Sequence, residues 1–99
     1  MTSTRTALPW TKIEREVKKA TKAYATEVND PDLFVINCRF LADFIDRHNE
    51  DYPTITKEAS FKGLQGRVTM AMNRMQWPRW TRQNKCGAGM KYIVPWGRM

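Results

Sequence analysis

Amide and hydroxyl side chains recur at helical spacing between residues 64 and 75. Gln65, Thr69 and Asn73 follow one another at intervals of four residues, which places them on one face of a helix. Such short side chains donate and accept hydrogen bonds, and this is the chemistry that reads the edges of base pairs. Gly66 lies on the same face and would let a partner approach the helix backbone. We therefore interpret Gln65, Thr69 and Asn73 as candidates for base reading.

Lysine and arginine side chains flank this face and continue towards the C-terminus. Cations of this kind contact phosphate oxygens and fix the register of a protein on a nucleic acid. The candidates for phosphate binding are Lys62, Arg67, Arg74, Arg79, Arg82, Lys85 and Lys91. Trp80 lies between two of these arginines and is a candidate for stacking on a base.

The distribution of charge agrees with a basic binding surface in the C-terminal half. The chain of 99 residues has a net charge of +7. Residues 1–52 contain 8 Lys and Arg against 9 Asp and Glu, whereas residues 53–99 contain 9 against the single acid Glu58. A polyanionic partner is expected, and the charge alone does not distinguish a nucleic acid from an acidic protein groove.

Acidic residues around the single histidine suggest a second chemistry, metal-dependent phosphodiester hydrolysis, which needs carboxylates converging on one ion. The residues concerned are His48, Asp43, Asp46, Glu50 and Asp51. Their negative charge would repel the substrate, so we interpret them as a solvated helix face and loop. The chain also has no phosphate-binding glycine loop. We expect no enzymatic activity and no cofactor.

Two cysteines, Cys38 and Cys86, are the other residues that could hold a metal. With only one histidine in the chain they do not complete a tetrahedral zinc site. No metal is therefore expected, and reduced thiols are typical of a cytoplasmic protein. No apolar run is long enough for a membrane helix, and no secretory signal is recognisable. The expected location is the cytoplasm of a bacterial host cell.

Apolar periodicity predicts a first helix from Thr11 to Val28, with Thr11 as its cap and Glu14 completing a capping box. Its apolar stripe consists of Ile13, Val17, Ala20, Tyr24 and Val28. This stripe could pair two copies of the chain as a homodimer or pack onto its own domain. Residues 1–9 are expected to form a flexible arm, and residues 10–99 a single domain.

The rest of the chain predicts further short elements. A second helix is expected over residues 31–48, with Asp30 as cap and Pro31 at its first position. A short strand at 54–56, a brief helix at 57–61 and a third long helix at 64–75 follow. The third helix would bury Leu64, Val68, Ala71 and Met75, turn Met70 outwards, and be followed by Trp77 closing the core. Residues 79–83 and 90–94 then predict a hairpin with a glycine-bearing turn between them.

This order of elements predicts a mainly helical α+β fold, a winged helix-turn-helix with an extra N-terminal helix and a C-terminal β-hairpin wing. In that architecture a recognition helix enters the major groove while the wing follows the backbone or an adjacent groove. Residues 64–75 would be the recognition helix, and residues 79–94 the wing.

Three stretches carry a resemblance to a known family: residues 68–77, 79–82 and 89–95. They resemble the winged-helix modules that are appended to phage and plasmid primase-helicases, over about residues 33–95. Those modules end the recognition helix with an aliphatic-Gly-Trp step, continue into a basic strand and finish with a Tyr-x-x-Pro-like strand end. Gln76 stands where these modules have glycine, and the chain carries no primase or ATPase part. The resemblance implies a free-standing DNA-binding domain of phage or mobile-element type.

The function expected from the sequence is binding of double-stranded DNA, as a regulator of transcription or a replication accessory factor. One alternative is a small phage-type protein that uses the same basic face to bind and inhibit a host protein complex. Another is binding of single strands or RNA through Trp80 and Tyr92. No membrane partner is expected.

Overall fold

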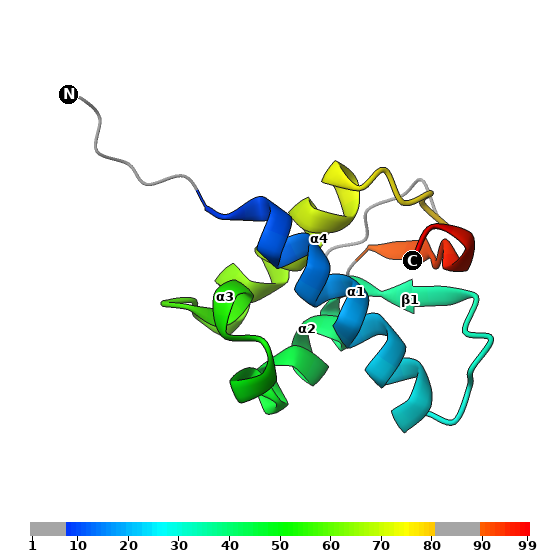
Figure 1. The fold of residues 1–99 in the computed structure, drawn as a ribbon, viewed down its shortest axis with the longest axis horizontal. Helices are drawn as coiled ribbons and strands as arrows, with labels where there is room; N and C mark the ends of the chain where they lie inside the picture. The colour runs from blue at the N-terminus through cyan, green and yellow to red at the C-terminus, as the bar shows by residue number, and fades with distance from the viewer. Residues whose placement is uncertain (1–7, 81–89) are drawn as a thin grey trace.

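The computed structural model describes residues 8–80 and 90–99, which form a mainly helical α+β fold (Figure 1). The elements in chain order are α1 (Trp10–Glu27), β1 (Val35–Asn37), α2 (Cys38–Arg47), α3 (Pro53–Thr56), α4 (Phe61–Arg74) and β2 (Lys91–Ile93), with 3-10 turns η1 (Asn49–Asp51) and η2 (Trp96–Arg98). The predicted fold class, mainly helical α+β, is confirmed at this level. Within the described residues, no helix is both long and apolar enough to span a membrane.

Helix α1 confirms the predicted N-terminal helix and packs against α2, α3 and α4. Three residues of its predicted stripe, Ile13, Val17 and Ala20, are fully buried. The apolar stripe is thus used within the chain. The predicted cap at Thr11 is wrong, because Pro9 occupies the N-cap position. The Pro9 carbonyl accepts a hydrogen bond from the Ile13 amide at 3.0 Å, so Thr11 already lies inside the first turn.

A strand and a shorter helix replace the long helix predicted for residues 31–48. Val35 and Ile36 lie in β1, which pairs antiparallel with β2 so that Ile36 is opposite Tyr92. Two successive β-branched side chains favour extended backbone when a partner strand is present. The partner strand lies more than fifty residues further along the chain. The periodicity of residues 31–48 therefore gives no indication of it. The helix prediction is therefore wrong for residues 31–37.

Helix α2 begins at a cap that lies inside the predicted helix. The Asn37 Oδ1 accepts a hydrogen bond from the Arg39 amide at 2.7 Å, which satisfies a donor of the first turn. The predicted cap at Asp30 and the predicted helical start at Pro31 are therefore wrong.

A short helix, α3, occupies the position of the predicted strand at residues 54–56. Pro53 suits the first helical position because its fixed φ is already helical. The Glu16 carboxylate of α1 accepts hydrogen bonds from the Thr54 and Ile55 amides at 3.2 and 2.8 Å. These bonds satisfy donors that a helix start leaves unpaired. A side chain from a distant part of the sequence thus favours the helix, and the strand prediction is wrong.

Helix α4 begins three residues earlier than predicted. Ser60 is its N-cap, and the Ser60 hydroxyl accepts a hydrogen bond from the Gly63 amide at 3.1 Å. The separate helix predicted over residues 57–61 is wrong, because Phe61 already belongs to α4 and Glu58 has a left-handed φ of 54°. The predicted apolar stripe of α4 is confirmed at Leu64, Val68 and Ala71, which are buried. The prediction is wrong for Met75, which lies at the C-cap and is only partly buried, and Met72 is buried in its place.

Strand β2 lies between two antiparallel neighbours. It pairs with β1 on one edge, and on the other edge Tyr92 forms an isolated bridge with Arg79. The Trp80 amide also donates a hydrogen bond to the Lys91 carbonyl at 2.9 Å. The two predicted hairpin arms, residues 79–83 and 90–94, therefore pair with each other where the structure describes both of them. Residues 81–89, which include the predicted turn, lie outside the described residues.

The core lies between the helices and this small sheet. Trp77 is 4% exposed, which confirms the prediction that it closes the core after the last long helix. Tyr92 is fully buried, whereas Met70 on the outer side of α4 is 50% exposed, as predicted.

Candidate nucleic-acid interface

The outer face of α4 is hollowed beside the start of α2. The depression has a volume of about 610 Å³ and is lined by Arg39, Phe61, Lys62, Gln65, Gly66 and Thr69. The opposite side of α4 packs into the core through Leu64 and Val68. Two of the three predicted base-reading residues and one predicted phosphate-binding lysine therefore share one concave surface.

Two residues of this depression, Arg39 and Phe61, were not predicted as site residues. Arg39 belongs to the acid-rich half of the chain, so a count of charge by halves does not single it out. The structure places it in the first turn of α2, where it reaches the depression. The signal that could have located it is Asn37, a preferred capping residue directly before the apolar stripe of α2.

Gly66 has no packing reason to lack a side chain. It lies in the interior of α4, where glycine costs about 1 kcal/mol relative to alanine. A Cβ atom at Gly66 would meet no heavy atom within 4 Å. The helix backbone is therefore open to a partner at the depression, at the expense of helix stability.

Asn73, the third predicted base reader, is engaged within the fold. Its Oδ1 accepts a hydrogen bond from the Tyr92 hydroxyl at 2.8 Å. Burial raises the pKa of that hydroxyl above its ordinary value, so Tyr92 remains a donor at neutral pH. Asn73 therefore ties α4 to β2, and it does not line the depression that holds Gln65 and Thr69.

Two of the predicted phosphate-binding arginines make contacts inside the protein. The Arg67 Nη1 donates hydrogen bonds to the carbonyls of Ile55 and Lys57, at 2.9 and 2.7 Å. Arg74 forms an ion pair with Glu14 of α1 at 3.1 Å. Both guanidinium groups hold α4 against its neighbouring helices, on the side of α4 that faces α1 and α3.

The remaining predicted cations follow α4 in the sequence. Arg79 and Lys91 are both exposed; Arg79 lies opposite Tyr92 in the isolated bridge, and Lys91 is the first residue of β2. Arg82 and Lys85 lie outside the described residues. Among the described residues of the predicted phosphate-binding set, Lys62, Arg79 and Lys91 are exposed and form no ion pair, whereas the exposed Arg74 is paired with Glu14.

Trp80, the stacking candidate, is 51% exposed. Its ring meets that of Phe34 edge-on, with the ring centroids 5.5 Å apart. Tyr92, its proposed partner in binding single strands, is fully buried and presents no ring face to a base. Only one of the two aromatic residues in that alternative is accessible.

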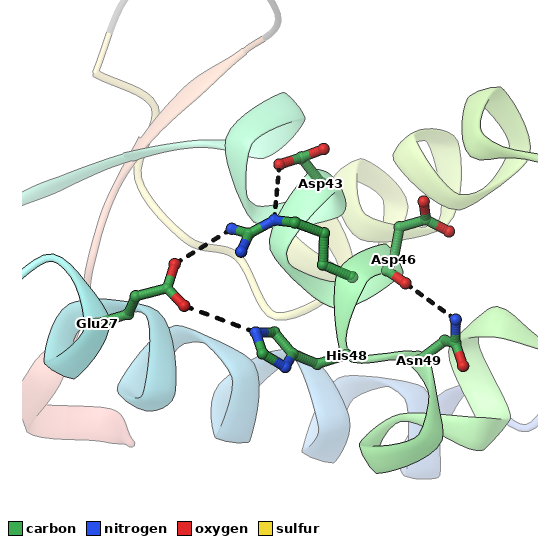
Figure 2. Close-up of polar contacts among 6 residues, drawn as sticks. Glu27, Asp43, Asp46, His48 and Asn49 are labelled. Carbon is green, nitrogen blue, oxygen red and sulfur yellow. Dashed lines mark hydrogen bonds and ion pairs between the residues drawn. The ribbon is translucent and has the colours of Figure 1, made fainter.

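Close to His48, Glu27 of α1 joins the ends of α1 and α2 (Figure 2). Arg47 forms ion pairs with Asp43 at 3.1 Å and with Glu27 at 3.2 Å. The His48 Nε2 lies 3.6 Å from a Glu27 carboxylate oxygen. Among the residues that the structure describes, no three His, Cys, Asp or Glu side chains are placed to hold a metal ion. The contacts of Glu27 with Arg47 and His48 connect α1 to α2.

The depression on α4 is interpreted from its own geometry. No protein-family model, curated protein or solved structure matches the chain. What the described residues bring together is an amide, a hydroxyl and an exposed helix backbone between two cationic side chains, and this arrangement can bind a polar, anionic surface.

Proposed function

We propose that the protein binds duplex DNA by placing the outer face of α4 in the major groove. The major groove admits an α-helix, and its base edges present the donors and acceptors that amide and hydroxyl groups pair with. Gln65 and Thr69 would contact base edges, while Lys62 and Arg39 at the same depression would contact phosphates.

The observation that carries this proposal is Gly66. A glycine in a helix interior lowers stability, and no neighbouring atom in the described fold requires the missing side chain. Close approach of a base edge or backbone to α4 supplies the reason that the fold lacks. The loss of helix stability is then offset by contact with the partner.

The order of elements supports a winged helix-turn-helix as the architecture of this interface. Two paired segments, residues 78–80 and β2, follow the other elements, which are in order α1, β1, α2, the short α3 and α4. In this assignment α1 is the first helix of the motif and not an addition to it, because β1 lies between α1 and α2. The wing would extend from the segments around Arg79 and Lys91.

Gln76 departs in residue type from the phage-type winged-helix modules, but its backbone conformation is compatible with the resemblance. Those modules have glycine where this chain has Gln76. Here Gln76 has a left-handed φ of 60° just after α4, the backbone conformation that glycine adopts most easily. The backbone therefore turns after α4 as it would at a glycine, although the residue at this position is glutamine.

The replacement Gly66→Ala tests the proposal. Alanine should stabilise the fold by about 1 kcal/mol, raising the melting temperature by roughly 4–8 °C. It should also weaken binding to a duplex at least tenfold, because the added methyl group separates the helix from the DNA. Binding is measured by fluorescence anisotropy with a 30-base-pair duplex, and stability by thermal unfolding.

Gly97→Ala is the matched control. Gly97 also has no atom within 4 Å of a Cβ, but it lies in η2, outside the depression on α4. Its replacement should leave DNA affinity unchanged. If Gly66→Ala stabilises the fold and binds the duplex as tightly as the unmodified protein, the interface is not on this face of α4.

A protein partner is the second candidate, favoured by exposed aromatic side chains. Phe34, Phe40 and Trp80 are each more than half exposed, and Phe34 contacts Trp80. Exposed aromatic residues are enriched in protein interfaces. If the Phe34→Ser/Trp80→Ser variant keeps its affinity for duplex DNA while losing a co-purifying bacterial protein, this second function is supported.

A further inference from the structure

A second basic surface lies on α1. Four exposed cations follow one another at intervals of three or four residues and so form one stripe along the helix: Lys12, Arg15, Lys19 and Lys22. At a rise of 1.5 Å per residue, this stripe is about 15 Å long. Within the described part of the chain, none of these four side chains forms an ion pair. We call this set the α1 stripe.

The α1 stripe borders a hollow of about 250 Å³ between α1 and α3. Three of its cations line the hollow together with Glu16 and Thr54. Glu16 is the single acid in the lining, and both of its carboxylate oxygens accept hydrogen bonds from backbone amides of α3. Those donors offset the negative charge of Glu16, so the hollow keeps an excess of positive charge.

The α1 stripe and the depression on α4 are separate surfaces. The side of α4 that faces α1 and α3 carries Arg67 and Arg74, which bond to these two helices. The depression lies on another side of α4, towards α2, where Gln65, Thr69 and Arg39 line it. In Figure 1, α1 crosses over α2 and α4 with its own outer face turned to solvent. A straight duplex seated on α4 would therefore leave the α1 stripe uncovered.

The composition of the α1 stripe favours a nucleic-acid backbone over a protein. Protein interfaces centre on aromatic and other apolar side chains and are depleted in lysine. The large hydrophobic residues that the described structure exposes are Val28, Phe34, Phe40, Phe61, Met70, Trp80 and Trp96, and none of them lies within α1. Phosphate binding needs positive charge and tolerates flexible lysine side chains.

From these observations we propose that the α1 stripe binds the phosphate backbone of a second duplex, so that one protein molecule bridges two DNA segments. The inference rests on the proposed function for the first segment, which is held by α4. With four phosphate contacts, capture of the second duplex should fall about 150-fold between 50 and 200 mM salt.

A capture experiment separates the two binding events. A 30-base-pair duplex is immobilised and saturated with protein, and a fluorescent duplex of the same sequence is then added at 50 mM salt. The unmodified protein should retain the fluorescent duplex. The variant Lys12→Gln/Arg15→Gln/Lys19→Gln/Lys22→Gln should still bind the immobilised duplex but retain less than a tenth of the fluorescent one. The exposed Lys57 lies outside both surfaces, and Lys57→Gln should behave as the unmodified protein.

Other outcomes overturn the inference. If the unmodified protein binds the first duplex and captures no second one, the bridging role is wrong while the proposed function stands. Capture that survives the fourfold replacement would mean that bridging uses paired protein molecules and not the stripe. Binding of polyglutamate in place of the second duplex would assign the stripe to an acidic protein. If the unmodified protein binds no immobilised duplex, the proposed function itself fails, and the inference fails with it.

Discussion

Replacing Arg67 with methionine tests whether this arginine holds the fold together or binds phosphate. Methionine keeps an unbranched apolar stem and the helix propensity of the side chain but removes every donor. In the structure the Arg67 guanidinium bonds to two backbone carbonyls near the end of α3. We therefore expect Arg67→Met to destabilise the fold and to leave DNA binding nearly intact in the folded protein.

The magnitude follows from the two hydrogen bonds. A bond from a charged donor contributes about 1.5–3 kcal/mol when it is sheltered from water. The bond to the Ile55 carbonyl is partly buried, whereas the bond to the Lys57 carbonyl is exposed and water can replace it. The expected loss in the free energy of unfolding is about 2 kcal/mol. For a chain of this size that lowers the melting temperature by about 10 °C.

Urea unfolding measures the loss of stability, and duplex titration at several salt concentrations measures the number of phosphate contacts. For Arg67→Met the slope of log K against log salt should remain that of the unmodified protein. For Lys62→Met, at the depression, the slope should decrease in magnitude by about 0.9 while stability changes by less than about 0.5 kcal/mol. If Arg67→Met keeps full stability and loses one phosphate contact, the structural role assigned to Arg67 is refuted.

Two further replacements have expected outcomes of defined sign. Gln76→Gly should stabilise the fold by about 1 kcal/mol, since Gln76 has a φ of 60° that glycine adopts without strain. Thermal unfolding measures this gain in stability. Unchanged or lower stability of the variant would contradict the prediction. Burial raises the pKa of Tyr92 above its ordinary value near 10, so the stabilisation from its protonated hydroxyl is complete below pH 10 and is lost as the pH rises through the folded pKa. Burial also raises the pKa values of Tyr24 and Tyr52, so these two residues contribute to the same loss of stability at high pH. Tyr92→Phe should therefore reduce that loss without abolishing it, as measured by urea unfolding between pH 8 and 11. An identical pH dependence of stability in both proteins would contradict this expectation.

Helices α1 and α4 could be predicted from the sequence because the pattern that defines them is local. Their buried residues recur every three or four positions, and neither helix needs a distant partner to show its apolar side. Strand β1 and helix α3 could not be predicted in this way. Strand β1 depends on pairing with β2, and the start of α3 depends on Glu16.

The same limit applies to the candidate site. Helical spacing correctly placed Lys62, Gln65 and Thr69 on an outer face of α4. It also placed Arg67 and Arg74 on a flank of that helix, but a helical wheel does not show what packs beside the flank. The structure brings α3 and α1 to that side, and both arginines bond to them.

The central position of β2 has a consequence for the order of folding. The pairing of Ile36 with Tyr92 joins residues more than fifty positions apart, whereas the turns of α1 and α4 form from neighbours along the chain. Closing so long a loop carries an entropic cost that must be met before the contact stabilises anything. The helices should therefore associate first, and docking of Tyr92 between β1 and α4 should complete the native core as a late step. Until then the hydroxyl that orients Asn73 is missing, so α4 acquires its final setting only when β2 is in place.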